Sequence, residues 1–454
     1  GGLWSVGNVE KRAGMVVVHG RDPLPEWYDP ATDGFTPSLD SVVSSAAVSL
    51  AGRSTGARGG SNDEGEKAVK GGPSWSDMGS FVNGMPTIYL KVASYRDELC
   101  HLTLADAFEK AKHPDRIFVG VVEQNAAGDV PCLQVDGGEG FSECPGDSGE
   151  VHQPTLCKYA SHVRVYKQHA RDATGPTFAR HVGDRMYRGE YFVLQTDAHM
   201  TFVAGWDLDI TAQFDATGND MAVLSTYPTE VVGSLDAQGK SKRHTSPVMC
   251  ATGFTAEGLL RHGSAIEIYP MFGASAVLEP FWAAGFSFAR GHFAVRVPYD
   301  CCTSMLFQGE EIDIAVRAWT EGYDLYTPHN SVAFHPYSRK KRPPMFWENN
   351  DLHKGDGLKA ARRVQSLIHL GNPSASSFDG TDAHRYGTGN ARSADDFYAL
   401  FGVDRNTRKI TKDLCRWSTS GRMHKQLSAF LRPNGQGIDY SKAFSALGRP
   451  GSIK

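Results

Sequence analysis

The sequence lacks the marks of a membrane protein and of a nucleic-acid-binding protein. No apolar run reaches the roughly 20 residues that a membrane-spanning helix needs. Neither sign of charge is in excess, since the net charge is -4 and the isoelectric point is near 6.5. We therefore expect no membrane or nucleic-acid partner. No signal peptide is visible, although a chain that starts with Gly-Gly rather than Met is compatible with a removed or truncated N-terminus.

Cysteine is also sparse and unevenly spaced. The eight cysteines in 454 residues include no Cys-x-x-Cys pair and lack the density of a secreted disulfide scaffold. We therefore expect reduced thiols in a cytoplasmic protein. The alternative is a disulfide or a zinc site among Cys132, Cys144 and Cys157, which belong to a Gly-rich loop.

What is present is the composition of a globular protein with a large core, 40% hydrophobic and 22% charged. The length fits two or three domain-sized units. Residues 1–85 form a predicted N-terminal extension, in which the Gly-, Ser- and charge-rich stretch 51–84 is a predicted flexible linker. A compositional change at Pro86 begins a predicted central domain, 86–349, and residues 350–454 form a predicted C-terminal helical extension.

The central part alternates strand and helix patterns. Residues 87–93 and 117–122 are typical of buried strands, and 99–112 is typical of the helix between them. This order predicts an α/β doubly wound sheet, whose ligands bind at the carboxyl ends of the strands, where segment 94–97 would lie. The loop 124–159 is too long for a simple connection and is either functional or mobile.

The tetrapeptide Thr-Asp-Ala-His occurs twice, at 196–199 and at 381–384. The first copy ends a strand-like run, 190–195, whereas the second follows a cluster of turn formers with no strand before it. Side chains alternate along a strand, so Asp197 and His199 point to the same side and can share one cation. We interpret only the first copy as a metal site.

A third candidate ligand, His335, follows another strand-like stretch and precedes the basic run 339–342. A lone His is more often structural, and a basic run is usually a solvated face. Together, however, one carboxylate, two imidazoles and a positive cluster suit a divalent ion such as Mn²⁺ bound to a diphosphate. Such an ion stabilises a departing nucleoside diphosphate, which predicts transfer from an activated sugar.

Two adjacent acidic residues, Glu310 and Glu311, open a predicted helix over 312–320. Acidic residues at a helix N-terminus are commonly favourable partners of the helix dipole. The functional interpretation is a carboxylate that orients a substrate hydroxyl.

These motifs closely resemble those of the Skp-type hydroxyproline N-acetylglucosaminyltransferases, retaining enzymes of the GT-A fold, over about 86–347. The matching segments, in the order of the family, are 92–97, 195–199, 284–288, 298–300, 309–311 and 333–337, with 392–401 extending the match. The resemblance implies an α/β GT-A glycosyltransferase fold, which is a Rossmann-like mixed sheet flanked by helices.

The resemblance also implies roles for individual residues. The uridine and ribose would be held by Ala93, Ser94, Tyr95, Arg96 and Asp97. The donor sugar would lie near Gly285, and the diphosphate would face Arg339, Lys340 and Lys341. The metal ligands would be Asp197, His199 and His335. Either Glu310 or Glu311 matches the acidic position beside the donor sugar and acceptor.

The function implied is metal-dependent transfer of GlcNAc from UDP-GlcNAc to a 4-hydroxyproline on the Skp adaptor of an SCF-class ubiquitin ligase. Retention, and hence an α-linked product, is taken from the family, and front-face attack is preferred because no separate nucleophile is evident. The alternatives are another protein or glycan hydroxyl as acceptor, a nucleotide-sugar hydrolase, and a nucleotide-binding module without catalysis. A homodimer is left open.

Overall fold

The computed structural model describes most of the chain. The described residues are 10–12, 15–19, 24–29, 34–36, 78–133, 142–143, 151–152, 154–269, 275–339 and 343–453. The predicted linker lies outside them except for its last residues, where β5 (Phe81–Val82) forms a hairpin with β6 (Met85–Pro86).

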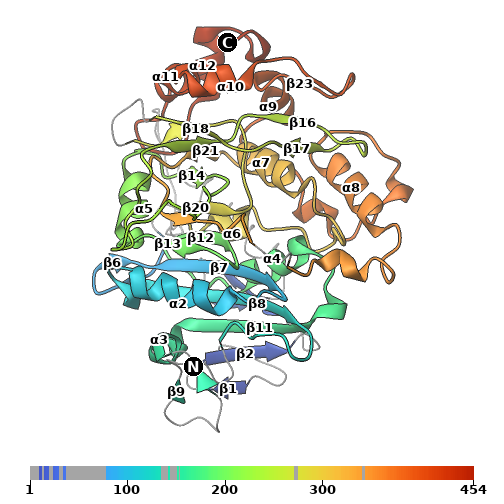
Figure 1. The fold of residues 1–454 in the computed structure, drawn as a ribbon. Coiled ribbons are helices and arrows are strands. Elements are labelled where there is room, and N and C mark those ends of the chain that lie inside the picture. Colours follow the sequence, from blue (N-terminus) through green and yellow to red (C-terminus); the bar gives the residue numbers. More distant parts are fainter. Residues whose placement is uncertain are drawn as a thin grey trace, which may run out of the picture.

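A mixed sheet of ten strands, counted within the described residues, organises the molecule (Figure 1). Its order is β1 (Glu10–Arg12), β2 (Met15–His19), β11 (Val163–His169), β8 (Ile117–Asn125), β7 (Ile88–Tyr95), β12 (Phe192–Asp197), β20 (Phe286–Arg290), β14 (Ala222–Ser225), β21 (Asp324–Thr327) and β19 (Val277–Leu278). Strands β2, β11, β8, β7 and β12 are parallel, and β20 is antiparallel to both of its neighbours. The predicted Rossmann-like mixed sheet is therefore confirmed.

Helices flank this sheet and continue beyond it. They are α2 (Cys100–Lys110), α3 (Pro154–Lys158), α4 (Pro176–Arg185), α5 (Trp206–Asp215), α6 (Phe293–Arg296), α7 (Glu310–Thr320), α8 (Asp356–Leu367), α9 (Ala394–Leu400), α10 (Leu414–Thr419), α11 (Arg422–Ser428) and α12 (Tyr440–Leu447). Figure 1 places α10, α11 and α12 at the end of the molecule opposite to β1 and β2. No helix among the described residues has both the length and the apolar composition needed to cross a membrane.

Short two-stranded ladders complete the fold around the sheet. They are β3 (Trp27–Asp29) with β4 (Gly34–Thr36), β9 (Ser142–Glu143) with β10 (Val151–His152), β13 (Thr201–Phe202) with β22 (Ala333–Phe334), β15 (Ser246–Val248) with β18 (Ile266–Ile268), β16 (Thr252–Phe254) with β17 (Leu260–His262), and β23 (Val403–Asp404) with β24 (Lys409–Ile410). The β13–β22 ladder matters most for the site, because it carries residues near 335 back to residues near 200.

Strand β7 has both faces covered because it lies in the middle of a sheet with helices on its faces. Its residues Ile88 to Val92 are 5% exposed or less. On one face the Tyr89 hydroxyl donates to the Gly183 carbonyl at 2.6 Å, and the Lys91 ammonium pairs with Asp184 of α4. These contacts fix α4 against the sheet.

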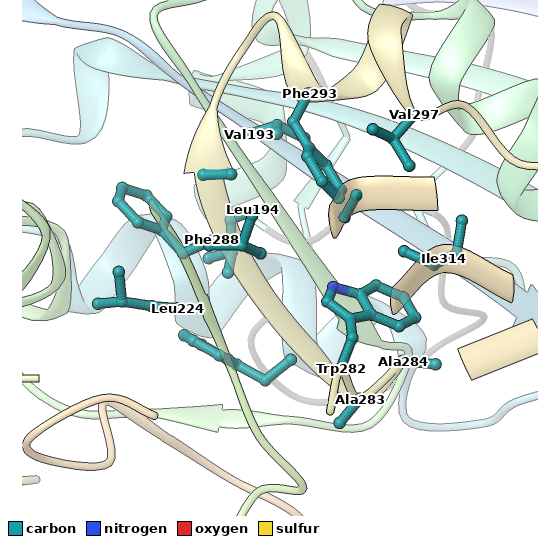
Figure 2. Close-up of a cluster of buried hydrophobic side chains, with 14 of the residues drawn as sticks. Val193, Leu194, Leu224, Trp282, Ala283, Ala284, Phe288, Phe293, Val297 and Ile314 are labelled. Atoms are coloured by element: carbon teal, nitrogen blue, oxygen red, sulfur yellow. The ribbon is translucent and has the colours of Figure 1, made fainter. Parts of the chain in front are cut away.

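The core continues through the antiparallel strand β20 (Figure 2). Phe288 stacks on Phe192 with ring centroids 4.8 Å apart, and Trp282 lies on the same side of the sheet as Ile314 of α7. The Trp282 indole N–H donates to the Ser287 hydroxyl at 2.9 Å, so its polar atom is satisfied within the core. This packing positions the loop before β20, which reaches the functional site.

The expectation of reduced thiols is wrong. The structure contains the disulfides Cys100–Cys132, Cys250–Cys415 and Cys301–Cys302, and Cys157 is disulfide-bonded as well. Cys132 pairs with a helix residue rather than within the Gly-rich loop, so it is not available for the zinc alternative. Folding brings together cysteines up to 165 residues apart, which no local spacing reveals.

Candidate active site

The parallel pairing of β7 and β12 brings two predicted segments together. Asp197 is the last residue of β12 and lies in register with Ala93 of β7. Because the carboxyl ends of parallel strands meet at one edge of a sheet, segment 93–97 borders residues 197–199. The ends of these two strands therefore lie side by side, although the cavity beside them is lined by Asp197 and by none of residues 93–97.

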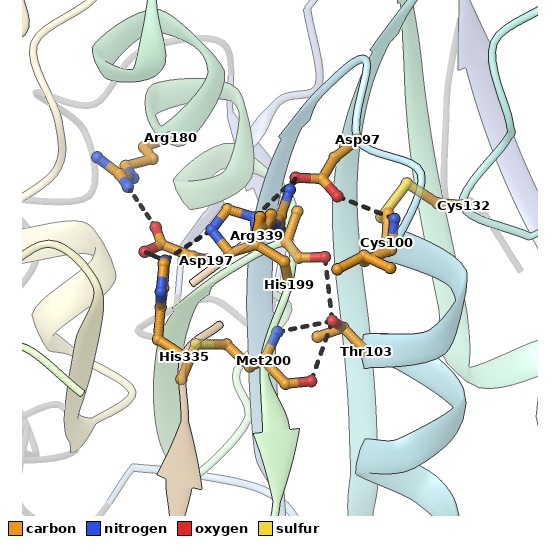
Figure 3. Close-up of polar contacts among 12 residues, drawn as sticks. Asp97, Cys100, Thr103, Cys132, Arg180, Asp197, His199, Met200, His335 and Arg339 are labelled. Carbon is orange, nitrogen blue, oxygen red and sulfur yellow. Dashed lines mark hydrogen bonds and ion pairs between the residues drawn. A yellow bond between two sulfur atoms is a disulfide. The ribbon is translucent and has the colours of Figure 1, made fainter. Parts of the chain in front are cut away.

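The three predicted metal ligands form one cluster (Figure 3). Strand β22 pairs with β13, with Phe334 opposite Thr201, and this ladder carries His335 to His199. Ligand atoms of Asp197, His199 and His335 all lie within 4.8 Å of one another, and the two Nε2 atoms are 2.8 Å apart. All three residues are half-buried.

The donor set fits a divalent cation. Ligand atoms about 2.1 Å from an ion are separated by roughly 3 to 4 Å, which is the scale of this cluster. His199 Nδ1 lies 2.7 Å from a carboxylate oxygen of Asp97, which holds the proton on Nδ1 and leaves the Nε2 lone pair free. Burial lowers the pKa of His335 to about 4, so this imidazole is neutral at physiological pH.

Asp97 connects the cluster to the basic segment. Both terminal nitrogens of Arg339 lie 3.3 Å from the Asp97 carboxylate oxygen that faces His199. Although burial alone would raise the pKa of Asp97, the hydrogen bond and charge of His199 together with the charge of Arg339 lower it below its ordinary value. The other predicted diphosphate contacts, Lys340 and Lys341, lie outside the described residues.

The remaining predicted nucleotide-binding residues Ser94, Tyr95 and Arg96 differ in their hydrogen-bond partners. The Ser94 hydroxyl is buried and has no hydrogen-bond partner within the described residues. Arg96 instead pairs with Asp129 at 2.8 Å and with Glu348 at 3.0 Å. The Tyr95 hydroxyl is also within 3.4 Å of the Glu348 carboxylate.

Glu310 belongs to a second charged network that includes Arg180 of α4. One terminal nitrogen of Arg180 lies 2.9 and 2.8 Å from the two carboxylate oxygens of Glu310, and the other lies 3.3 Å from Asp197. Arg180 and Glu310 are 8% and 5% exposed, so the pair is largely removed from water. Arg180 therefore links the metal-type cluster to α7. The sequence gives no sign of this role for Arg180, because nothing around it distinguishes it from any other helix Arg.

Glu311 has neutral partners instead. Its carboxyl accepts hydrogen bonds from the Tyr227 hydroxyl and, at 3.0 Å, from the Ala284 backbone N–H. Burial raises the pKa of Glu311 to about 7, against the lowering effect of these two hydrogen bonds. The two adjacent glutamates thus differ in their partners, since Glu310 is bonded to a guanidinium and Glu311 to a phenol and a backbone N–H.

Gly285 allows the loop before β20 to approach the cluster. A Cβ atom at this position would lie 3.3 Å from an Asp197 carboxylate oxygen and 3.1 Å from the Pro228 ring. A side chain there would press on both groups. The glycine therefore lets this loop lie close to the cluster without displacing either group.

These groups share a cavity of about 970 Å³. Of the predicted site residues, Asp197, His335, Gly285, Glu310 and Glu311 line it, together with Arg180. His199 and Asp97 lie behind this lining and touch it through the His199–His335 contact. The arrangement can hold a cation against an anionic ligand, and the carboxyl of Glu311, whose pKa is raised, lines the same cavity.

The second Thr-Asp-Ala-His copy does not line the cavity. Its Asp382 pairs with Arg385 at 3.3 Å in a short 3-10 turn, and among the described residues it belongs to no cluster of potential metal ligands.

The chain matches one family of known proteins. A family model described as Glycosyltransferase (GlcNAc) matches residues 87–407. No curated protein matches the sequence.

Two solved structures are similar at low levels. A crystal structure of GalNAc-T7 with UDP, GalNAc and Mn²⁺ is 12% identical with a TM-score of 0.41, covering 82% of this chain and 61% of that one. The chain thus spans less than two thirds of GalNAc-T7. S. aureus TarS 1–349 in complex with UDP-GlcNAc is 16% identical with a TM-score of 0.38, covering 70% and 72% of the two chains.

Proposed function

This chain belongs to the Glycosyltransferase (GlcNAc) family, and from this premise we propose that it transfers GlcNAc from UDP-GlcNAc to a hydroxyl acceptor in a metal-dependent reaction. The observation that carries the proposal is the half-buried cluster of Asp197, His199 and His335 at the wall of a large cavity, beside two acidic residues of α7.

The donor diphosphate would be bound at the ends of β7 and β12. Asp197, His199 and His335 would hold a divalent cation, with Mn²⁺ as the proposed ion, because one carboxylate and two imidazoles are a mixed oxygen and nitrogen set. The cation, when bound, would stabilise negative charge on the leaving nucleoside diphosphate. Asp97 would orient His199, and Arg339 would supply additional positive charge.

Segment 93–97 would hold the uridine and ribose. The buried, unpartnered hydroxyl of Ser94 supports this role, since an unsatisfied polar atom at a strand end can bond an incoming ligand. Gly285 would let the donor sugar lie close to the cluster.

The two glutamates would act differently on the sugar. Glu310 is neutralised by Arg180 and would position that guanidinium and Asp197 rather than attack the anomeric carbon. Glu311 would contact a hydroxyl of donor or acceptor, since its raised pKa allows it to donate or accept a proton near neutral pH. Because Glu310 is bonded to Arg180 and Glu311 to Tyr227 and the Ala284 N–H, neither is aligned as a free nucleophile, and we propose front-face attack with retention and an α-linked product.

The proposed acceptor is a 4-hydroxyproline of a Skp-type adaptor, supported by the order of the sequence motifs. The disulfides favour a second acceptor class, because disulfides persist in oxidising compartments and an SCF adaptor works in a reducing one. That second class is a hydroxyl of a protein or glycan in an oxidising compartment.

The test is UDP release from a panel of UDP-sugars with Mn²⁺. Among these donors, we expect only UDP-GlcNAc to release UDP. The rate of release should be at least 100-fold slower in Asp197→Ala. It should be unchanged in Asp382→Ala, which alters the corresponding Asp of the second tetrapeptide. Acceleration by a hydroxyprolyl Skp-type peptide would support the first acceptor, and acceleration by other hydroxyl acceptors the second. Equal release with and without any acceptor would establish a hydrolase instead, and equal rates in Asp197→Ala and wild type would overturn the site.

A further inference from the structure

A second cavity, of about 730 Å³, lies outside the proposed donor site. Three structural parts surround it: the turn of the β16–β17 hairpin, one face of α8 with the loop after it, and the β23–β24 hairpin. Figure 1 shows β16, β17, α8 and β23 on the same side of the molecule. A volume of this size accommodates several side chains of a ligand.

The cavity is lined by three guanidinium groups, from Arg362, Arg405 and Arg408. Arg405 is already paired, since it lies 2.7 Å from the carboxylate of Asp395. Arg362 and Arg408 have no carboxylate partner within the described residues. Glu257 is the one acidic residue among the described residues of the lining, and it is exposed. The cavity therefore has an excess of positive charge that its own walls do not neutralise.

The guanidinium of Arg408 has a defined position over the hairpin turn. A Cβ atom at Gly258, where φ is +83°, would lie 2.9 Å from the Arg408 guanidinium carbon and 2.9 Å from the Gln365 amide nitrogen. Gln365 in turn donates to the Glu257 carbonyl at 2.6 Å. The glycine thus leaves room for Arg408 against a turn that Gln365 fixes.

The same hairpin forms a wall of the active-site cavity. Thr252 and His262, at the open end of the hairpin, line the first cavity, whereas Glu257 and Gly258, at its turn, line the second. The five residue steps from Thr252 to Glu257 span at most about 17 Å when extended. A bound extended peptide of similar length would reach from one cavity to the other.

We propose that the second cavity binds an acidic segment of a polypeptide acceptor, about five residues from the hydroxyl that enters the active site. Arg362 and Arg408 bind its carboxylates, and Leu358, an apolar lining residue that is 47% exposed, contacts its backbone or apolar side chains. This inference rests on the proposed function, since it assumes a transferase with a polypeptide acceptor. A polypeptide fits better than a small anion because the cavity adjoins the wall of the active site.

The test uses the full chain and two fluorescein-labelled octapeptides, one alternating Glu and Ser and the other alternating Gln and Ser. Fluorescence anisotropy at low salt would measure their binding. We expect the acidic peptide to bind wild type at least 10-fold more tightly than the neutral one. The variant R362Q/R408Q should lose at least 10-fold of that affinity, whereas the matched variant R416Q/R449Q, with the same change in net charge, should stay within twofold.

UDP binding by calorimetry, measured on the same samples, separates this inference from the proposed function. Unchanged UDP binding with lost peptide binding in R362Q/R408Q supports the acidic-segment site. Equal losses in both double variants, or equal binding of the two peptides, would overturn it. Inorganic pyrophosphate provides a further test. If it displaces the acidic peptide at concentrations below the dissociation constant of the peptide, the cavity is a site for a small anion and the acidic-segment proposal is overturned. Absence of UDP binding in wild type would instead count against the donor site.

Discussion

At the level of single residues, Glu310 and Glu311 show how two adjacent identical side chains acquire different chemistry. One carboxylate forms a two-oxygen ion pair with Arg180, and the other accepts hydrogen bonds from a phenol and a backbone N–H. A helix turns by about 100° per residue, so neighbouring residues on α7 point to different surroundings. The sequence left the choice between them open, and these surroundings supply the distinction.

Glu311 predicts a pH profile. Its pKa is raised to about 7, so between pH 8 and pH 6 the fraction ionised falls about tenfold. If the ionised carboxylate is the active form, the rate of UDP release by wild type should fall by a similar factor over this range. The residual rate of Glu311→Gln should stay constant over the same range. Tyr227→Phe provides the control, because removing a hydrogen bond that lowers the pKa should move the inflection to higher pH. The same inflection in Glu311→Gln would assign it to another group.

The raised pKa of Glu311 also has a consequence for stability. The folded carboxyl keeps its proton between about pH 4.5 and 7, whereas the unfolded carboxyl loses it, so this group makes the fold less stable as pH rises through that window. Glu311→Gln should remove this contribution.

For Glu310 we predict an effect on the free energy of unfolding rather than on the pH profile of activity. Glu310→Gln leaves the buried Arg180 guanidinium without its main counter-charge, which costs roughly 3 to 5 kcal/mol when a buried pair is broken. Urea unfolding at pH 7 should show this loss. Glu311→Gln is the matched control and should cost much less, since it replaces a carboxyl that is half protonated at that pH. Equal losses in the two variants would contradict a buried ion pair at Glu310.

At the level of secondary structure, the elements predicted from sequence are those with long buried runs. Strand β7 was predicted at 87–93 and is Ile88–Tyr95, and β12 was predicted at 190–195 and is Phe192–Asp197. Because β12 extends beyond its predicted end, Asp197 is the last strand residue. The strand fixes the direction of the Asp197 side chain more firmly than a loop would. Apolar side chains mark such strands clearly, because the centre of the sheet is buried on both faces.

Other parts of the site depend on contacts between distant segments and carry no local pattern. Arg180 contacts Glu310 across 130 residues of sequence, and only the packing of α4 and α7 brings them together. His335 was predicted despite a similar separation from His199, because the order of the motifs indicated it. The predicted division into three domains stays a prediction.

Helix α5 provides a test at this level. Asp207, in its first turn, accepts hydrogen bonds from the backbone N–H groups of Lys112 and His113 at 2.6 and 3.2 Å and from Arg116 Nε at 3.1 Å. It is fully buried, so Asp207→Asn leaves the buried Arg116 without a counter-charge and should cost roughly 3 to 5 kcal/mol. The control Asp209→Asn, in the same turn, should cost less than about 0.5 kcal/mol in urea unfolding.

At the level of the whole molecule, the C-terminal helices are tied to the sheet domain in two ways. Trp319 of α7 packs against Phe397 of α9 and Tyr440 of α12, with ring centroids 5.7 and 4.2 Å apart. The disulfide Cys250–Cys415 adds a covalent link between segments 165 residues apart. Both links make the C-terminal helices part of the folded unit that contains the active site.

This disulfide predicts a large effect of reduction. Closing a loop of 165 residues lowers the entropy of the unfolded chain, and the chain-entropy relation gives about 5 kcal/mol of stabilisation. The adjacent pair Cys301–Cys302 closes no such loop and should contribute little by this mechanism. The double variant Cys250→Ser/Cys415→Ser should therefore unfold at markedly lower urea concentration than wild type, whereas Cys301→Ser/Cys302→Ser should stay close to it. In reducing buffer, the stability of wild type should approach that of the first variant. Equal stability of wild type in oxidising and reducing buffer would mean that the disulfide contributes nothing. A reducing compartment would then be no obstacle to this fold.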